Sequence, residues 1–89
     1  MQAKDIPDKV MLEFFHQMDG KWAMLFGEKF SVWIGGECKE FQPFKAPYKV
    51  MLAKMKQLHK RGLIKGCTCG CRGDFSITDK GREWLMNTP

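Results

Sequence analysis

Negative charge is missing from the middle of this 89-residue chain. Between Glu40 and Asp74 the sequence has eight Lys or Arg residues and no Asp or Glu. Residues 1–44 carry five Lys and seven acids, a balance of −2, whereas residues 45–89 carry ten Lys or Arg and three acids, a balance of +7. A basic segment of this kind favours a surface that binds a polyanion, and the acidic half is suited to contacts within the chain or with a protein partner.

Long apolar runs are also absent. No stretch approaches the roughly 18 apolar residues of a membrane span, and the first ten residues, MQAKDIPDKV, lack the apolar core of a signal peptide. We therefore expect a cytoplasmic, intracellular protein whose four cysteines are reduced. With 44% hydrophobic residues, the chain is suited to one folded domain, residues 1–89, and is too short for two cores.

Motifs of common enzymes are missing as well. The sequence has no Gly-rich phosphate loop, no nucleophile elbow and no zinc-protease histidine pair. Together with the basic second half, their absence favours a binding protein over an enzyme.

Apolar side chains at helical spacing predict a helix over residues 47–61, with Pro47 at its first position. They are Tyr48, Met51, Leu52, Met55, Leu58 and His59. The basic residues 59–61 suit the negative end of the helix dipole, and Gly62 suits the left-handed conformation that ends a helix. Leu63 would then contact the last turn of the helix.

The opposite face of this expected helix is basic and has no acid. Its members are Lys49, Ala53, Lys56, Gln57 and Lys60, with Lys54 and Arg61 on one flank. Such a face suits phosphate, but surface helices are often lysine-rich for solubility alone, so charge by itself leaves both interpretations open.

Two short segments of β-type composition follow, residues 63–65 and 75–77, and the ten residues between Ile64 and Phe75 include three glycines. They predict an antiparallel hairpin. Thr78 then offers a hydroxyl to cap a last helix, in which Trp84 and Leu85 pack back onto the sheet.

The second half of the chain resembles a known family. A helix ending in Arg-Gly-Leu-Ile, a hairpin, and the segment Ile-Thr-Asp-Lys-Gly-Arg-Glu-Trp-Leu at residues 77–85 are similar to the recognition helix, wing and closing element of winged helix-turn-helix domains. The Gly-Cys-Thr-Cys-Gly-Cys-Arg-Gly-Asp segment at residues 66–74 also resembles the wing of small phage or prophage proteins. The resemblance implies an α+β fold with about three helices, a C-terminal two-stranded wing and a short closing helix.

A first helix is expected near the start of the chain, with Asp5 as its cap, a beginning around residues 6–7 and an end at residues 19–20. Its apolar stripe consists of Val10, Met11, Phe14, Phe15 and Met18. We expect a core helix with no direct role in chemistry, and His16 beside the stripe as a partly buried surface residue.

Residues 21–34, KWAMLFGEKFSVWI, fit two structures. Trp22, Phe26, Phe30 and Trp33 share one helical face, whereas Trp22, Met24, Phe26, Phe30, Val32 and Ile34 fit a β-hairpin that turns at residues 27–29. The resemblance implies a short strand near Trp22 and a second helix from about Leu25 to Trp33, which we adopt, although Gly27 would destabilise that helix by about 1 kcal/mol. In either structure we expect the aromatic side chains to be core rather than a platform for stacking bases.

Glycine, proline and mixed charge predict a loop from Gly35 to Ala46. It differs from the family, in which a turn of about three or four residues joins the two helices. We expect Phe41 and Phe44 to fold back onto the core.

Three cysteines, Cys67, Cys69 and Cys71, lie at the tip of the expected hairpin. Zinc could bind there with Cys38, His59 or His16 as a fourth ligand, but a spacing of one residue is shorter than structural zinc sites favour. A redox pair activated by Arg72 and Lys65 is a second explanation, and small side chains in a tight turn are a third. We assign no metal or cofactor.

The resemblance implies binding of double-stranded DNA, as in a small transcriptional regulator, with helix 47–61 in the major groove. The residues expected nearest the DNA are Lys45, Tyr48, Lys49, Ala53, Lys56, Gln57 and Lys60, with Lys65 and Arg72 on the wing. Gln57 is expected to read a base edge and the lysines to contact phosphate. A homodimer through the N-terminal half is also expected. The alternatives are a winged-helix module that docks on an acidic protein, and a metal or thiol sensor acting through the cysteines.

Overall fold

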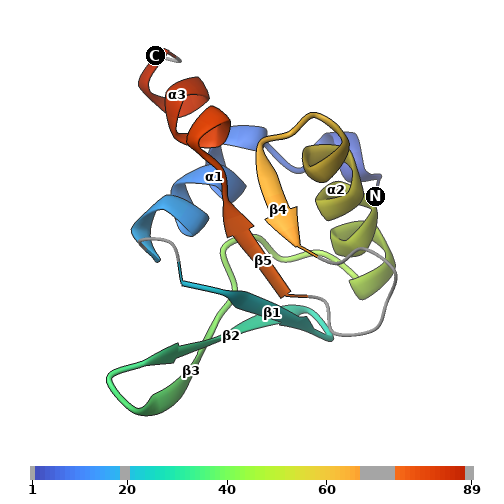
Figure 1. Ribbon diagram of the computed structural model, residues 1–89. Helices are drawn as coiled ribbons and strands as arrows, with labels where there is room; N and C mark the ends of the chain where they lie inside the picture. The colour runs from blue at the N-terminus through green and yellow to red at the C-terminus, as the bar shows by residue number, and fades with distance from the viewer. Residues whose placement is uncertain (1, 19–20, 67–73, 88–89) are drawn as a thin grey trace.

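The computed structural model describes residues 2–18, 21–66 and 74–87, which form an α+β fold with a five-stranded antiparallel sheet (Figure 1). In chain order the elements are the 3-10 turn η1 (Ala3–Asp5), α1 (Asp8–Gln17), β1 (Ala23–Phe26), β2 (Lys29–Ile34), β3 (Glu37–Phe41), α2 (Tyr48–Lys60), β4 (Ile64–Gly66), β5 (Asp74–Ile77) and α3 (Asp79–Asn87). The strand order is β3-β2-β1-β5-β4. In the described ranges, no helix has the length and apolar character needed to cross a bilayer.

One face of the sheet carries the core. In Figure 1, α1 lies behind β5 and α2 lies beside β4, so the opposite face of the sheet is turned toward the viewer. Phe30 of β2 and Phe75 of β5 are fully buried on the covered face. Phe14 and Phe15 of α1 pack on Phe30, with ring centroids 5.2 and 5.5 Å away. α2 contributes Met51, Met55 and Leu58, all with no exposed area. The hydrophobic core therefore lies on one side of the sheet.

The prediction of a helix, a hairpin and a capped last helix in the second half is confirmed. α2 spans Tyr48–Lys60, and β4 and β5 pair antiparallel. Pro47 is the N-cap of α2 rather than its first helical residue. His59 is exposed, so it does not belong to the apolar stripe of the helix.

The predicted second helix at residues 25–33 is wrong, because these residues form the antiparallel hairpin of β1 and β2. Phe26 pairs with Lys29 across a two-residue loop, and Gly27 in that loop has a φ of 64°, which glycine adopts without strain. Ala23 of β1 also pairs with Phe75 of β5. Pairing on both sides of β1 outweighs any local helical tendency in this segment.

The predicted loop from Gly35 to Ala46 is wrong in part, because it contains β3, which pairs with β2. Gly35 and Gly36 have φ values of 59° and 83°, as a two-residue hairpin turn requires. Phe41 and Phe44 are partly buried against the core, as predicted.

The first helix begins later than predicted. Asp5 lies in η1, and Pro7 is the N-cap of α1, with no side-chain capping bond. The stripe prediction is largely confirmed, since Met11, Phe14, Phe15 and Met18 are buried together with Leu12, while Val10 is partly exposed and His16 is exposed. Residues 19–20, the predicted end of this helix, lie outside the described residues.

Thr78 joins the end of α2 to the start of α3. Its Oγ1 donates a hydrogen bond to the carbonyl oxygen of Gly62 at 2.6 Å and accepts one from the backbone N–H of Gly81 at 3.0 Å. The backbone approaches closely here, since a Cβ on Gly81 would lie 2.2 Å from the carbonyl oxygen of Leu63. Glycine at position 81 is thus required for α3 to pack at this distance.

Candidate nucleic-acid interface

The end of α2 is defined by a glycine cap. Arg61 is the C-cap, and Gly62 has a φ of 78°. The N–H of Gly62 donates to the carbonyl of His59 and the N–H of Leu63 donates to that of Leu58, both at 3.0 Å. These two bonds form a Schellman motif, which satisfies carbonyls that a helix end leaves open. The cap therefore sets both the length of α2 and the direction in which the chain enters β4.

The predicted basic face of α2 is exposed. Lys49, Ala53, Lys56, Gln57 and Lys60 all lie on the solvent side, opposite the buried Met51 and Leu58. Tyr48 is 41% exposed, and Lys45 is exposed just before the helix. We call the set of Lys45, Tyr48, Lys49, Ala53, Lys56, Gln57 and Lys60 the α2 face.

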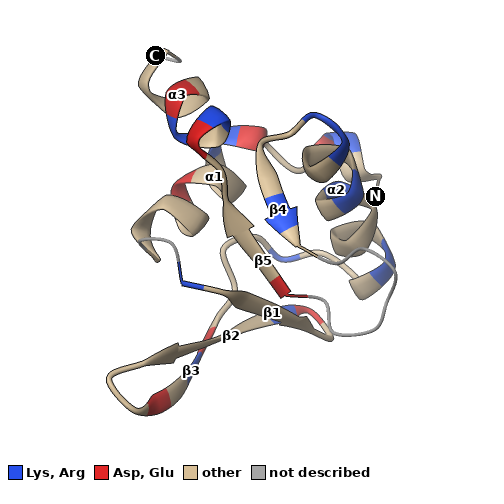
Figure 2. Cartoon of the chain, viewed as in Figure 1, with Lys and Arg blue, Asp and Glu red and all other residues tan. Residues whose placement is uncertain are grey.

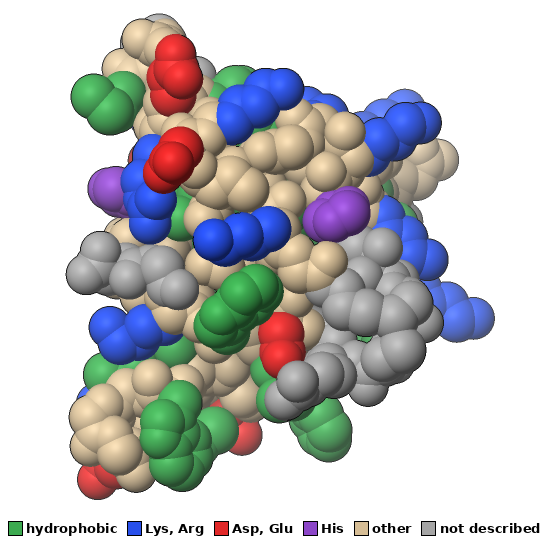
Figure 3. Space-filling view, in the orientation of Figure 1, with side chains coloured by type: hydrophobic (Ala, Val, Ile, Leu, Met, Phe, Trp, Pro, Cys, Tyr) green, Lys and Arg blue, Asp and Glu red, His purple; other side chains and the backbone are tan. Residues whose placement is uncertain are grey.

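Positive charge on the α2 face is not neutralised by neighbouring acids. α2 has no Asp or Glu in its sequence. Within the described residues, none of Lys49, Lys56 and Lys60 takes part in an ion pair. Figure 2 shows Lys and Arg positions along α2, and Figure 3 shows cationic side chains along the margin of the molecule where α2 lies. The residues of the α2 face itself are thus all cationic or neutral.

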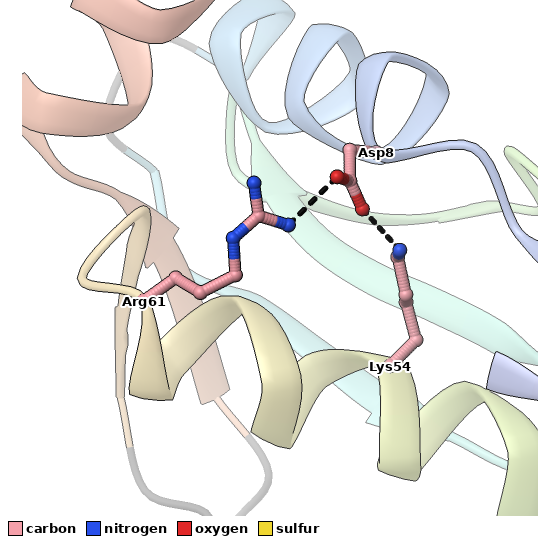
Figure 4. A network of polar contacts seen from close by, with 3 residues as sticks. All are labelled: Asp8, Lys54 and Arg61. Atoms are coloured by element: carbon pink, nitrogen blue, oxygen red, sulfur yellow. Dashed lines mark hydrogen bonds and ion pairs between the residues drawn. The ribbon is translucent and has the colours of Figure 1, made fainter. Parts of the chain in front are cut away.

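Lys54 of α2 and Arg61 at its C-cap do not belong to the α2 face. Lys54 is only 3% exposed and forms an ion pair with Asp8, the first residue of α1 (Figure 4). Arg61 donates from Nη1 to the other carboxylate oxygen of Asp8 at 2.7 Å. Partial burial alone would raise the pKa of Asp8, but the hydrogen bonds and charges of Arg61 and Lys54 outweigh it and hold the pKa below its ordinary value. Asp8 therefore anchors α1 to α2.

The predicted wing residues are not part of the α2 face. Lys65 of β4 is exposed on the open face of the sheet, with its Nζ 6.0 Å from the ring centroid of Trp22. β4 packs beside α2, so Lys65 lies on a surface adjoining the α2 face. Arg72 lies outside the described residues.

Aromatic side chains on the open face of the sheet were missed by sequence reasoning. Trp22, Phe26 and Trp33 are 52%, 75% and 67% exposed, so the prediction that the aromatics of residues 21–34 are core holds only for Phe30. The signal available in the sequence was the alternation of Trp22, Met24 and Phe26 with the smaller Ala23 and the buried Leu25.

A metal site is not found in the part of the chain that the structure describes, where no three Cys, His, Asp or Glu side chains cluster. Cys38 is exposed and free. The zinc and redox hypotheses for Cys67, Cys69 and Cys71 concern residues outside the described ranges.

Comparison with known proteins adds no relative: no protein-family model, no curated protein and no solved structure matches this chain.

Proposed function

We propose that this protein binds double-stranded DNA through the α2 face. The observation that carries the proposal is an acid-free helix surface on which Lys49, Lys56 and Lys60 are exposed and lack ion pairs within the described residues. Lysines arranged in this way neutralise phosphates and release counterions, which is the main source of affinity in DNA binding. A solubility function alone would not require acids to be absent from the whole helix.

The dimensions of α2 suit the major groove. Its 13 residues span about 20 Å. An α-helix with its side chains is about 10–12 Å in diameter, which fits a groove about 12 Å wide. Gln57 and Ala53 lie among the exposed lysines, so an amide and a small side chain would face the base edges while the lysines contact phosphate. Gln57 is the residue we expect to read a base, because its amide can pair with both polar groups of an adenine edge.

The arrangement around α2 supports a variant of the winged helix-turn-helix fold. As in that family, a helix leads directly into a hairpin, here β4 and β5, and an earlier strand, β1, pairs with the second hairpin strand. The second helix of the family is replaced by β2 and β3. In this variant the ion pairs of Asp8 with Lys54 and Arg61 brace α2 against α1. A small transcriptional regulator or accessory factor, of the phage or prophage type that the hairpin sequence resembles, is the role that we infer.

Charge reversal on the α2 face tests the proposal. In an electrophoretic or anisotropy assay with a random duplex at about 50 mM salt, the Lys49→Glu, Lys56→Glu, Lys60→Glu triple variant should bind at least 100-fold more weakly than wild type. Glutamate is a good helix former and the three positions are exposed, so the variant should fold.

A matched control carries Lys21→Glu, Lys29→Glu and Lys39→Glu, three exposed lysines outside η1 and β4, the elements packed on α2. It makes the same change in net charge but leaves the α2 face intact. Equal losses in the two triple variants, or no duplex binding by the wild-type protein at 50 mM salt, would show that the α2 face is not a DNA interface.

A further inference from the structure

The open face of the sheet carries large apolar side chains in water. Trp22, Met24, Phe26 and Trp33 are all at least 40% exposed, and they come from or adjoin β1 and β2. In Figure 3, hydrophobic side chains are visible on the viewer's side over the region where Figure 1 places these strands. Three of the four are aromatic, which is the residue class that stacks on nucleobases.

Two of the rings on this face are cross-strand neighbours, and the third lies apart from them. Extending the β1–β2 register beyond the pair Ala23 and Val32 sets Trp22 opposite Trp33, while Phe26 lies at the far end of β1. In the part of the chain that the structure describes, Phe14, Phe15, Phe30 and Phe41 form ring-to-ring contacts in the core. Trp22, Phe26 and Trp33 are each more than half exposed, so each ring offers contact area to a ligand.

Lysines accompany these rings. The Nζ of Lys65 lies 6.0 Å from the Trp22 ring centroid, and Lys29 is the cross-strand partner of Phe26. Glu40 pairs with Lys29 at 3.6 Å, but both side chains are more than half exposed, so this ion pair is weak and easily exchanged for a phosphate. Asp74 on the same face is only partly exposed. Lys65 belongs to β4, which packs beside α2.

A second copy of the chain is the rival occupant of this face. Aromatic side chains present about 150–250 Å² each, so the exposed fractions of Trp22, Phe26 and Trp33, together with Met24, amount to roughly 400 Å² of apolar surface. A stable protein interface buries about 800 Å² on each partner, of which roughly 450 Å² is apolar, so apolar area alone does not distinguish a protein partner from a nucleic acid. Exposed aromatic rings with lysines beside them are the combination with which proteins hold single-stranded nucleic acid.

We propose that the open face of the sheet binds single-stranded nucleic acid, with bases stacked on Trp22, Phe26 and Trp33 and phosphates held by Lys65 and Lys29. This site is separate from the α2 face and does not depend on duplex binding there. An extended single strand can place its bases on these side chains, whereas the bases of a duplex are stacked inside the helix and cannot reach the rings.

Substitutions at Trp33 distinguish stacking from general apolar contact. The probe is a labelled oligothymidylate of about 12 nucleotides, followed by fluorescence anisotropy and by quenching of tryptophan emission. Trp33→Leu keeps an apolar side chain but removes the ring, and should weaken binding roughly ten-fold. Trp33→Phe keeps a ring and should weaken it no more than about three-fold. Position 33 is exposed, so both variants should fold, which circular dichroism will verify.

Two further measurements distinguish binding at the open face of the sheet from binding at the α2 face. Duplex binding should be unchanged in Trp33→Leu, whereas the Lys49→Glu, Lys56→Glu, Lys60→Glu variant should lose duplex binding and retain quenching by the oligothymidylate. The duplex proposal and the single-strand proposal can therefore fail independently, and these measurements show which one has failed. A parallel titration with oligouridylate shows whether the 2′-hydroxyl affects affinity, and binding of either strand through the rings supports the proposal.

Three results would overturn it: no binding of either oligonucleotide at low salt, equal binding by wild type and Trp33→Leu, or a dimer in analytical ultracentrifugation that Trp33→Leu dissociates. The last result would assign the face to self-association.

Discussion

Nη1 of Arg61 lies 2.7 Å from Oδ2 of Asp8, and the other carboxylate oxygen of Asp8 pairs with the buried ammonium of Lys54. One acid of α1 therefore holds two cations of α2. Asp8 and Lys54 are 46 residues apart in sequence, so the contact depends on the tertiary fold. It joins α1 to the side of α2 that carries the buried Met51, Met55 and Leu58, while Lys49, Lys56 and Lys60 are exposed on the other side.

The two ends of this ion pair should respond differently to mutation. Asp8→Ala leaves the ammonium of Lys54, 4% exposed, without a counter-charge, and should lower the free energy of unfolding by about 3 kcal/mol. Lys54→Met fills a similar volume and leaves Asp8 paired with Arg61, so it should change stability by less than about 1 kcal/mol. Urea denaturation followed by circular dichroism measures both. Equal destabilisation by the two changes would contradict this account.

Stability should fall in acid partly through Asp8. Its pKa is lowered in the folded protein, so its contribution is fully present above the ordinary value of 3.8 and is lost as pH falls through the folded pKa. Asp8→Asn cannot ionise. The difference in unfolding free energy between wild type and Asp8→Asn should be constant above about pH 5 and should shrink steadily below it. A difference that grows as pH falls would mean that the folded pKa is raised instead.

Gly81→Ala should destabilise the protein although alanine is the better helix former. Helix propensity alone favours alanine by about 1 kcal/mol. The added methyl, however, would lie 2.2 Å from the Leu63 carbonyl oxygen, which is backbone and cannot move without shifting β4. We expect a net loss of about 2 kcal/mol, measured by thermal and urea denaturation. Glu83→Ala on the exposed side of α3 is the control and should stay within about 0.5 kcal/mol.

Thr78→Val tests the junction between α2 and α3. Valine keeps the shape of threonine but removes the hydroxyl that bonds Gly62 and Gly81, so stability should fall by about 1–2 kcal/mol. Thr78→Ser retains the hydroxyl and should lose less than half as much. If serine is as damaging as valine, the methyl group rather than the two hydrogen bonds is responsible.

The salt dependence of duplex binding should report the lysines of the α2 face and Lys65. About five phosphate contacts predict a slope of about −4 to −5 in a plot of log affinity against log salt concentration. Lys56→Ala should reduce the slope by about 1 and weaken binding to all sequences alike. Gln57→Ala should leave the slope unchanged and reduce the preference among sequences. A slope unaffected by Lys56→Ala would remove that residue from the interface.

Elements with local signals were predictable from the sequence. α2 has a helical period and ends in Gly62, whose cap bonds lie within five residues, and Thr78 caps α3 within three. Contacts between residues so close together in the chain can be predicted from the local sequence. The exposed α2 face followed from the same period, without knowledge of the rest of the fold.

The β1–β2–β3 hairpins were harder to predict. The strand that pairs with β1 lies far away in the chain, and the composition of β3 resembles that of a loop. β1 is apolar on both faces, and only its pairing with β5, about 50 residues later in the chain, selects the covered one. β3 is a charged edge strand that looks like a loop in sequence. The pair Gly35 and Gly36 was the available hairpin signal. Burial of Lys54 was unpredictable for a similar reason, since its partner Asp8 comes from another helix.

The strand order has a consequence for synthesis on the ribosome. β5 is the last of the described strands to be made, yet it lies between β1 and β4 and joins the first three strands to β4. Until β5 emerges, a nascent chain exposes one edge of β1 beside the apolar residues of α1. We expect that interval to be when the polypeptide depends most on chaperones, and that the risk of aggregation falls once β5 has paired.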